Sequence, residues 1–334
     1  MAPFKSSLAR SATKLFGVFR DRDLSLRGFN SASRKIFFSA SGGTKITSGS
    51  NVYHVFTTSG ALVVSGGLSK NMEILVVGGG GGTGGTYTGG GGGGGVAHGP
   101  SVTVVPGTHT VTVGDGGTQT ADNQGNANSP GGTSSIVLPA GTIRGLGGGT
   151  GTIDAYQTGP AQYNPGGSGG GNGDDNSPNA GDATQPGEPN FGIGIVHYGN
   201  PGKGPPSGNA PGADADGGGG GGAGGGGGPS HTDGRPGGVG QPFSNFPAPV
   251  IEPAIPSPVR PAWTPTVGPT GIFAGGGTGA KGPTARVPGG GGGGESPGTG
   301  GDGVNFSGGG AGGVNAGAGG SGGNGIVIIR YTTD

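Results

Sequence analysis

Blocks of glycine between residues 78 and 325 constrain the fold of this chain more than any other feature. Gly makes up 95 of the 334 residues. Each Gly loses more backbone freedom on folding than other residues do, and the average cost is about 1–2 kcal/mol per residue. Side-chain burial cannot offset this cost, so the region is either disordered or packed through its backbone. The blocks span residues 78–82, 89–95, 217–222, 224–228, 275–277, 289–294 and 308–310.

Polyproline II geometry gives backbone packing a physical basis. It has about three residues per turn and a rise of about 3.1 Å per residue, and it makes no internal hydrogen bonds. Glycine chains in this geometry can lie close together because no Cβ intervenes, and each satisfies the N–H and C=O groups of its neighbours. A block of seven residues would span about 22 Å. We therefore expect a polyglycine II array of stacked left-handed helices.

Two apolar strands bracket the glycine region, at 73–77 and 326–331. Two hairpins are predicted, one across 58–60 and one across 106–107. The predicted fold is mainly β plus the polyglycine II array, with a small antiparallel β domain closing over the glycine helices. The predicted domains are an arm at 1–40, a β-rich domain at 41–145, a glycine-rich body at 146–325 and a closing strand at 326–334. Further strands are expected at 35–38, 52–56, 61–64, 101–105, 109–113 and 135–138.

The first 40 residues differ from the rest in charge. They carry eight Lys or Arg against Asp21 and Asp23, a net charge of +6, whereas the remainder carries −6. Apolar residues at steps of three and four predict an amphipathic helix over 6–20. A solvated arm and a mitochondrial transit peptide are alternatives, but we favour an anchor that orders against a partner protein. The anchoring residues are Leu8, Arg10, Lys14, Leu15, Phe16, Phe19, Leu24, Leu26 and Arg27.

Large side chains of the body are concentrated in its loops. Pro is dense in an excursion at 229–270, which predicts a stiff, extended segment that is neither helix nor central strand. Phe243, Phe246 and Trp263 form a stacking platform for sugar rings, or else pack the excursion against itself or a neighbouring subunit. Loops on a rigid scaffold are where recognition is usually placed. The receptor-binding candidates are Tyr156, Tyr163, Phe191, Tyr198, Phe243, Phe246 and Trp263.

The sequence offers little for catalysis, cofactors or metals. It has no cysteine, and its five histidines are scattered. The close acidic pairs are Asp174/Asp175 and Asp214/Asp216, without the ligand spacing of a calcium loop. No apolar run reaches the 18 or so residues that span a bilayer, and the acidic body disfavours nucleic acid. We therefore expect no enzyme activity, no catalytic residues, no cofactor, no metal and no membrane insertion.

Several stretches resemble the glycine-rich domain of virion proteins from tailed bacteriophages, especially phages of marine bacteria and cyanobacteria. The likeness covers residues 46–333 and is carried by 55–60 before 73–80, 89–95 followed by 96–99, 111–117, and the ending 319–331. It implies a tail fibre or its receptor-binding tip on the virion surface, with polyglycine helices stacked in a slab. It also implies a homo-oligomer, for which we favour a trimer. No catalytic residues come with it.

Several functions remain open on these grounds. As an adhesin, the chain would attach to other virion proteins through residues 1–40 and bind a host polysaccharide or outer-membrane protein. As a capsid or neck decoration fibre, it would only coat the particle. A non-phage extracellular glycine-rich structural protein is a more remote alternative. A depolymerase would need paired carboxylates, and only the two acidic pairs named above offer them.

Overall fold

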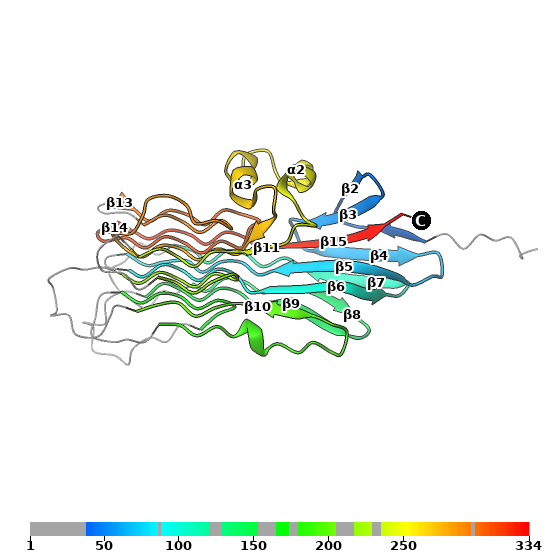
Figure 1. Cartoon of the computed structure of the whole chain (residues 1–334), viewed down its shortest axis with the longest axis horizontal. Coiled ribbons are helices and arrows are strands. Elements are labelled where there is room, and N and C mark those ends of the chain that lie inside the picture. Colours follow the sequence, from blue (N-terminus) through cyan, green and yellow to red (C-terminus); the bar gives the residue numbers. More distant parts are fainter. Residues whose placement is uncertain are drawn as a thin grey trace, which may run out of the picture.

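The computed structural model has two β-sheets at one end and glycine segments that continue from them along the long axis (Figure 1). The predicted helix at 6–20 and the whole set of anchoring residues lie outside the described residues. So do Tyr156 and Tyr163. The structure describes residues 38–85, 88–119, 129–152, 165–173, 180–204, 217–228, 235–294 and 298–333.

A six-stranded antiparallel sheet joins the two strands that bracket the glycine region. In it, Val77 at the end of β5 lies opposite Ile326 at the start of β15. The prediction that one antiparallel β unit holds both ends of the glycine region is thus confirmed. The sheet consists, in order, of β10 (Val196–Tyr198), β6 (Val96–Val104), β5 (Lys70–Val77), β15 (Ile326–Thr332), β3 (Asn51–Phe56) and β2 (Thr44–Ser48).

A five-stranded sheet packs on one face of the six-stranded sheet. Its strand β4 alternates, with Leu62 and Val64 buried in the core between the sheets and Val63 exposed on the outer face. This period of two is the pattern of a sheet with one solvated face. The sheet consists, in order, of β1 (Ser39–Ser41), β4 (Gly60–Ser65), β7 (Gly107–Thr112), β8 (Ser134–Leu138) and β9 (Gly141–Gly145).

Strands β5 and β15 are buried on both faces, which explains their continuous apolar sequences. Ile74 and Val76 of β5 belong to the core between the sheets, whereas Leu75 and Val77 belong to a second core on the opposite face. In the same way, Ile328 of β15 packs in the second core. A strand that contributes to two cores has no polar alternation to show.

Both predicted hairpins are wrong. Strand β3 pairs with β2 and β15, whereas β4 pairs with β1 and β7, so the loop at 57–59 carries the chain from one sheet to the other. The same holds for β6 and β7 at 105–106. Packed sheets lie about 10 Å apart, a distance that three extended residues can span. A short turn between two strands is therefore compatible with a change of sheet as well as with a hairpin.

Glycine segments bond to one another through their backbones with a repeat of three residues. Segment 89–95 donates its N–H groups in turn to carbonyls of 146–152, 217–222 and 308–311, at N···O distances of 2.7–2.9 Å. The N–H groups of every third residue donate to the same neighbouring segment. The N–H groups of this single segment therefore bond to three different segments of the chain.

Carbonyl groups of the same segment accept bonds from three further segments. The donors lie in 78–81, 168–171 and at Gly277. Segment 89–95 thus has six hydrogen-bonded neighbours, three as acceptors and three as donors. Its buried backbone groups are satisfied without a sheet ladder, as buried backbone groups must be.

Close approach of these backbones explains why the positions are glycine. A Cβ added at any residue of 89–94 would overlap backbone atoms of a neighbouring segment. None of the glycines in 78–82 or 89–95 has a positive φ. Their lack of a side chain serves packing between segments, and the left-handed region of φ plays no part here.

Residues 241–273 fold back onto the six-stranded sheet, so the prediction of an extended, non-helical excursion is wrong here. Pro249, Pro253 and Pro261 each occupy the first turn of a short helix, where a missing N–H costs nothing. The elements are β11 (Gln241–Pro242), α2 (Ala248–Ile251), η4 (Glu252–Ala254), α3 (Arg260–Val267) and β12 (Ile272–Phe273). Elsewhere lie η3 (Gln185–Gly187), β13 (Gly298–Thr299) and β14 (Gly317–Ala318).

Candidate functional site

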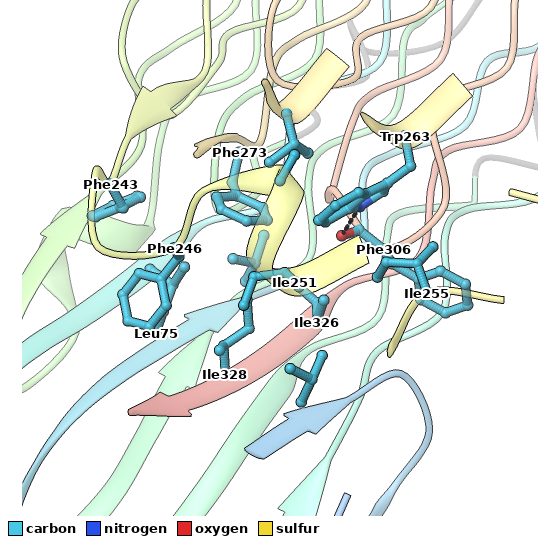
Figure 2. Packing of buried hydrophobic residues seen from close by; sticks show 14 of the residues in the cluster. Leu75, Phe243, Phe246, Ile251, Ile255, Trp263, Phe273, Phe306, Ile326 and Ile328 are labelled. Carbon is cyan, nitrogen blue, oxygen red and sulfur yellow. Dashed lines mark hydrogen bonds between the residues drawn. The ribbon is translucent and has the colours of Figure 1, made fainter. Parts of the chain in front are cut away.

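Aromatic side chains of the excursion form the second core. Trp263 and Phe246 are fully buried and Phe243 is only 6% exposed. Figure 2 shows Phe246 beside Leu75 of β5, and the Trp263 indole N–H donating to the carbonyl oxygen of Phe306 at 2.9 Å. In this arrangement the three rings offer no surface to a receptor. The rings pack the excursion against itself, as one of the two alternatives expects, and also against the six-stranded sheet, which neither alternative named.

A buried carboxylate holds the excursion to the sheet. Glu73 of β5, 8% exposed, accepts hydrogen bonds from His98 Nε2 at 2.9 Å and from Arg330 at 2.7 Å. It also accepts two bonds of 3.1 Å from the amide of Asn245, which lies between β11 and α2. The His98 ring lies 5.0 Å from that of Phe243. Three strands of the sheet and the excursion therefore meet at this one carboxylate.

The electrostatics of the cluster favour the ionised carboxylate. Burial alone raises the pKa of Glu73, but hydrogen bonds from His98, Asn245 and Arg330 outweigh it and hold the pKa below its usual value. Such bonds to the charged form lower a carboxyl pKa. The cluster stabilises the docked excursion at neutral pH.

Sequence reasoning missed this cluster, although a signal was present. Glu73 is four residues before Val77, and Arg330 is four residues after Ile326. If the two bracketing strands pair antiparallel from the glycine end, these opposite charges must face each other, as they do. The contribution of His98 had no such signal, because it depends on the partner of β5 on its other side.

We expect Glu73→Gln to destabilise the protein by about 1–3 kcal/mol at pH 7, because Arg330 and His98 lose a buried charged partner. A carboxyl whose folded pKa is lowered stabilises the fold above its unfolded pKa, about 4.3, and this stabilisation is lost as the pH falls through the folded value. Urea unfolding at pH 7 and pH 3 measures the difference, which should shrink at the lower pH.

Glu188→Gln is the matched control for this change. Glu188 accepts a bond of 2.8 Å from Arg144, whose side chain is exposed. An exposed pair of this kind contributes about 0–1 kcal/mol. Equal losses in the two variants would contradict a special role for Glu73.

Segment 185–198 carries the two remaining receptor-binding candidates that the structure describes. Tyr198 is half-buried and packs edge-on against Phe243 at 5.5 Å. Phe191 is 39% exposed and has a φ of +50°, a conformation that bulky side chains rarely adopt. Of the five described candidates, Phe191 is the one that presents its ring to solvent.

Buried Gln185 fixes this segment. Its side-chain amide donates to the carbonyl of Arg144 and to His197 Nδ1, each at 2.8 Å, and its oxygen accepts from the N–H of Leu146. Burial lowers the pKa of His197, which favours a neutral ring that accepts at Nδ1. Gln185 thus anchors 185–198 to the end of β9.

The described ranges carry neither a cluster of metal ligands nor a membrane-spanning helix. No group of three or more His, Asp or Glu side chains there is placed to hold a metal ion. No described helix combines the length and the apolar character needed to cross a bilayer. Asp174/Asp175 and Asp214/Asp216 lie outside the described residues.

Comparison with known proteins gives one family. Among curated proteins, no match was found. The family model of a glycine-rich domain matches residues 57–332, which include both bracketing strands, the glycine segments and the excursion. The chain belongs to the glycine-rich domain family.

Proposed function

We propose that the glycine segments form a polyglycine II array. Three residues per turn point successive N–H groups about 120° apart, so one chain would donate to three neighbours and accept from three others. The three-residue repeat and the six neighbours of segment 89–95 support this. The absence of positive φ values in 78–82 and 89–95 agrees with it.

We further propose that the chain is a virion structural protein of a tailed phage, a tail fibre or fibre-tip adhesin at the virion surface. The observation that carries this proposal is the direction of the glycine segments. Segment 78–83 runs away from the sheets at the end of β5, and segment 88–95 runs back to them at the start of β6. Segments 308–314 and 317–325 run in the same way before β15. A slab rigidified by backbone bonds would hold the loops between such segments at fixed positions, where recognition is usually placed.

The partners of this proposal are those that the sequence favours. The arm at 1–40 would attach to other virion proteins, and the chain would assemble as a homo-oligomer, with a trimer preferred. Tyr156, Tyr163, Phe191 and the half-buried Tyr198 remain the receptor-binding candidates, because the buried rings of Phe243, Phe246 and Trp263 pack in the second core. The host ligand would be a surface polysaccharide or an outer-membrane protein.

Competition for adsorption tests the adhesin proposal. The purified full-length chain, in its assembled state, is added to host cells before the phage that encodes it. Reduced adsorption supports an adhesin. Unchanged adsorption at saturating protein, together with antibody labelling of the capsid in electron micrographs, would favour the decoration fibre. A chain lacking residues 1–39 that still joins virions would contradict the anchoring role of the arm.

A further inference from the structure

A groove opens beside the five-stranded sheet at the edge of the sandwich. It has a volume of about 570 Å³ and is lined by Ser101 and Thr103 of β6, by Val105 directly after this strand, by the β8–β9 turn at 139–140, and by residues 192–193. This volume lies within the range of about 300–1,000 Å³ that is usual for ligand sites. None of the lining side chains is charged.

A β-bulge directs Ser101 into this groove. Met72 pairs with Val102 and Ile74 pairs with Gly99, so Pro100 and Ser101 together face the single residue Glu73. Bulges reorient side chains and are frequent beside functional sites. Within the described part of the chain, the Ser101 hydroxyl has no hydrogen-bond partner. The neighbouring Thr103 hydroxyl donates to Asn71 Oδ1 at 2.8 Å, so its oxygen can still accept a hydrogen bond from a ligand.

Phe191 lies next to the groove without lining it. It directly precedes the lining residues 192–193, and its ring covers Gly141, where an added Cβ would collide with the ring. Strained backbone of this kind persists only where the surrounding structure holds it, and such strain is concentrated at functional sites. Here the anchor through Gln185 and His197 holds the segment.

We propose that this groove binds a neutral pyranose unit of a surface polysaccharide. The apolar C–H face of a sugar ring packs on an aromatic ring, and sugar hydroxyls pair with Ser101 and Thr103. The uncharged lining gives no partner for a charged group, which favours neutral sugars. The β8–β9 turn lies at the end of the strands away from the glycine segments, so the groove would be a recognition site separate from the glycine loops. The inference deepens the proposed adhesin function and rests on it for the source of the ligand.

Binding to an array of neutral oligosaccharides, from di- to hexasaccharides of glucose, galactose, mannose and rhamnose, tests the inference with the full-length chain. Calorimetric titration of the best binder then measures the effect of each variant. Phe191→Gly removes the ring and relieves the left-handed backbone, and should weaken binding about tenfold. Ser101→Ala should weaken it about fivefold.

Val239→Ala is the matched control, because Val239 is an exposed apolar residue of the glycine region that does not line the groove. The affinity of this variant for the saccharide should equal that of the wild type. Thermal unfolding verifies that each variant is folded. Absence of binding to every neutral saccharide, or binding that neither variant weakens, overturns the inference. If both variants reduce competition for adsorption while no saccharide binds, the groove contacts a protein receptor, which also overturns it.

The same variants separate this inference from the proposed function. Saccharide binding at the groove without competition for adsorption would retain the site and reject the adhesin. Competition that survives both variants would retain the adhesin and reject the groove as its site.

Discussion

Replacing Gly80 by Ala is expected to destabilise the protein by about 3 kcal/mol or more, and to leave little folded chain. The N–H of Gly80 donates to Gly323 and its carbonyl accepts from Gly117. An added Cβ would overlap the carbonyl group of Gly309, and all three of its nearest atoms belong to backbone. Overpacking usually costs about 1–3 kcal/mol when side chains can adjust. Here the backbone segment that contains Gly309 must move, and that segment is itself hydrogen-bonded to further segments.

Urea unfolding of Gly80→Ala against Gly187→Ala measures this effect. Gly187 lies at the end of η3, and a Cβ added there meets no atom within 4 Å. Its replacement should leave stability within about 0.5 kcal/mol of the wild type, or raise it by restricting the unfolded chain. Similar stabilities for the two variants would show that the glycine segments tolerate side chains, and would contradict backbone packing as the basis of this region.

The strands could be predicted from the sequence because their apolar runs are strong. The ranges at 52–56, 61–64, 73–77, 135–138 and 326–331 all fall within observed strands. The pairing of the strands could not be predicted, because two apolar runs joined by a short loop can form a hairpin or can lie in two different sheets. Strand β9, by contrast, has Gly at both ends and a single buried Ile143, so its pattern is too weak to identify.

The excursion shows why the remainder could not be predicted. Its Pro residues exclude a long helix, but they permit short helices that begin at Pro. Whether such helices form depends on an apolar surface to cover, and that surface is the second face of a sheet whose strands are far away in the sequence. The same limit applies to the groove, since Ser101, Ala140 and Ile193 come together through the fold alone.

Trp263→Ala carries the second large expected effect, a loss of about 3–5 kcal/mol in the free energy of unfolding. The side chain is fully buried, and its ring lies 6.4 Å from that of Phe273. Truncation would leave a large cavity and an unpaired carbonyl at Phe306. Because Trp263 joins α3 to Phe306 and to the second core, we expect the excursion to detach before the sheets unfold.

Two measurements distinguish local detachment from global loss. Urea unfolding gives the total change, and limited proteolysis followed by mass spectrometry locates the first cleavage, which we expect within 241–273. Trp263→Phe retains an aromatic ring and removes the N–H donor, so it should cost only about 1–3 kcal/mol. Val239→Ala should stay within about 0.5 kcal/mol of the wild type. Cleavage of Trp263→Ala no faster than that of the wild type would contradict the role of Trp263 as the anchor of the excursion.

This result decides how receptor experiments on the excursion must be read. Replacing Phe243, Phe246 and Trp263 together removes much of the second core, so a loss of adsorption competition in that variant would follow from detachment of the excursion. Phe191→Gly changes a half-exposed ring outside that core. A loss of competition in Phe191→Gly, with proteolysis at 241–273 as slow as in the wild type, would therefore identify a recognition surface. The same loss accompanied by rapid cleavage there would identify a folding defect.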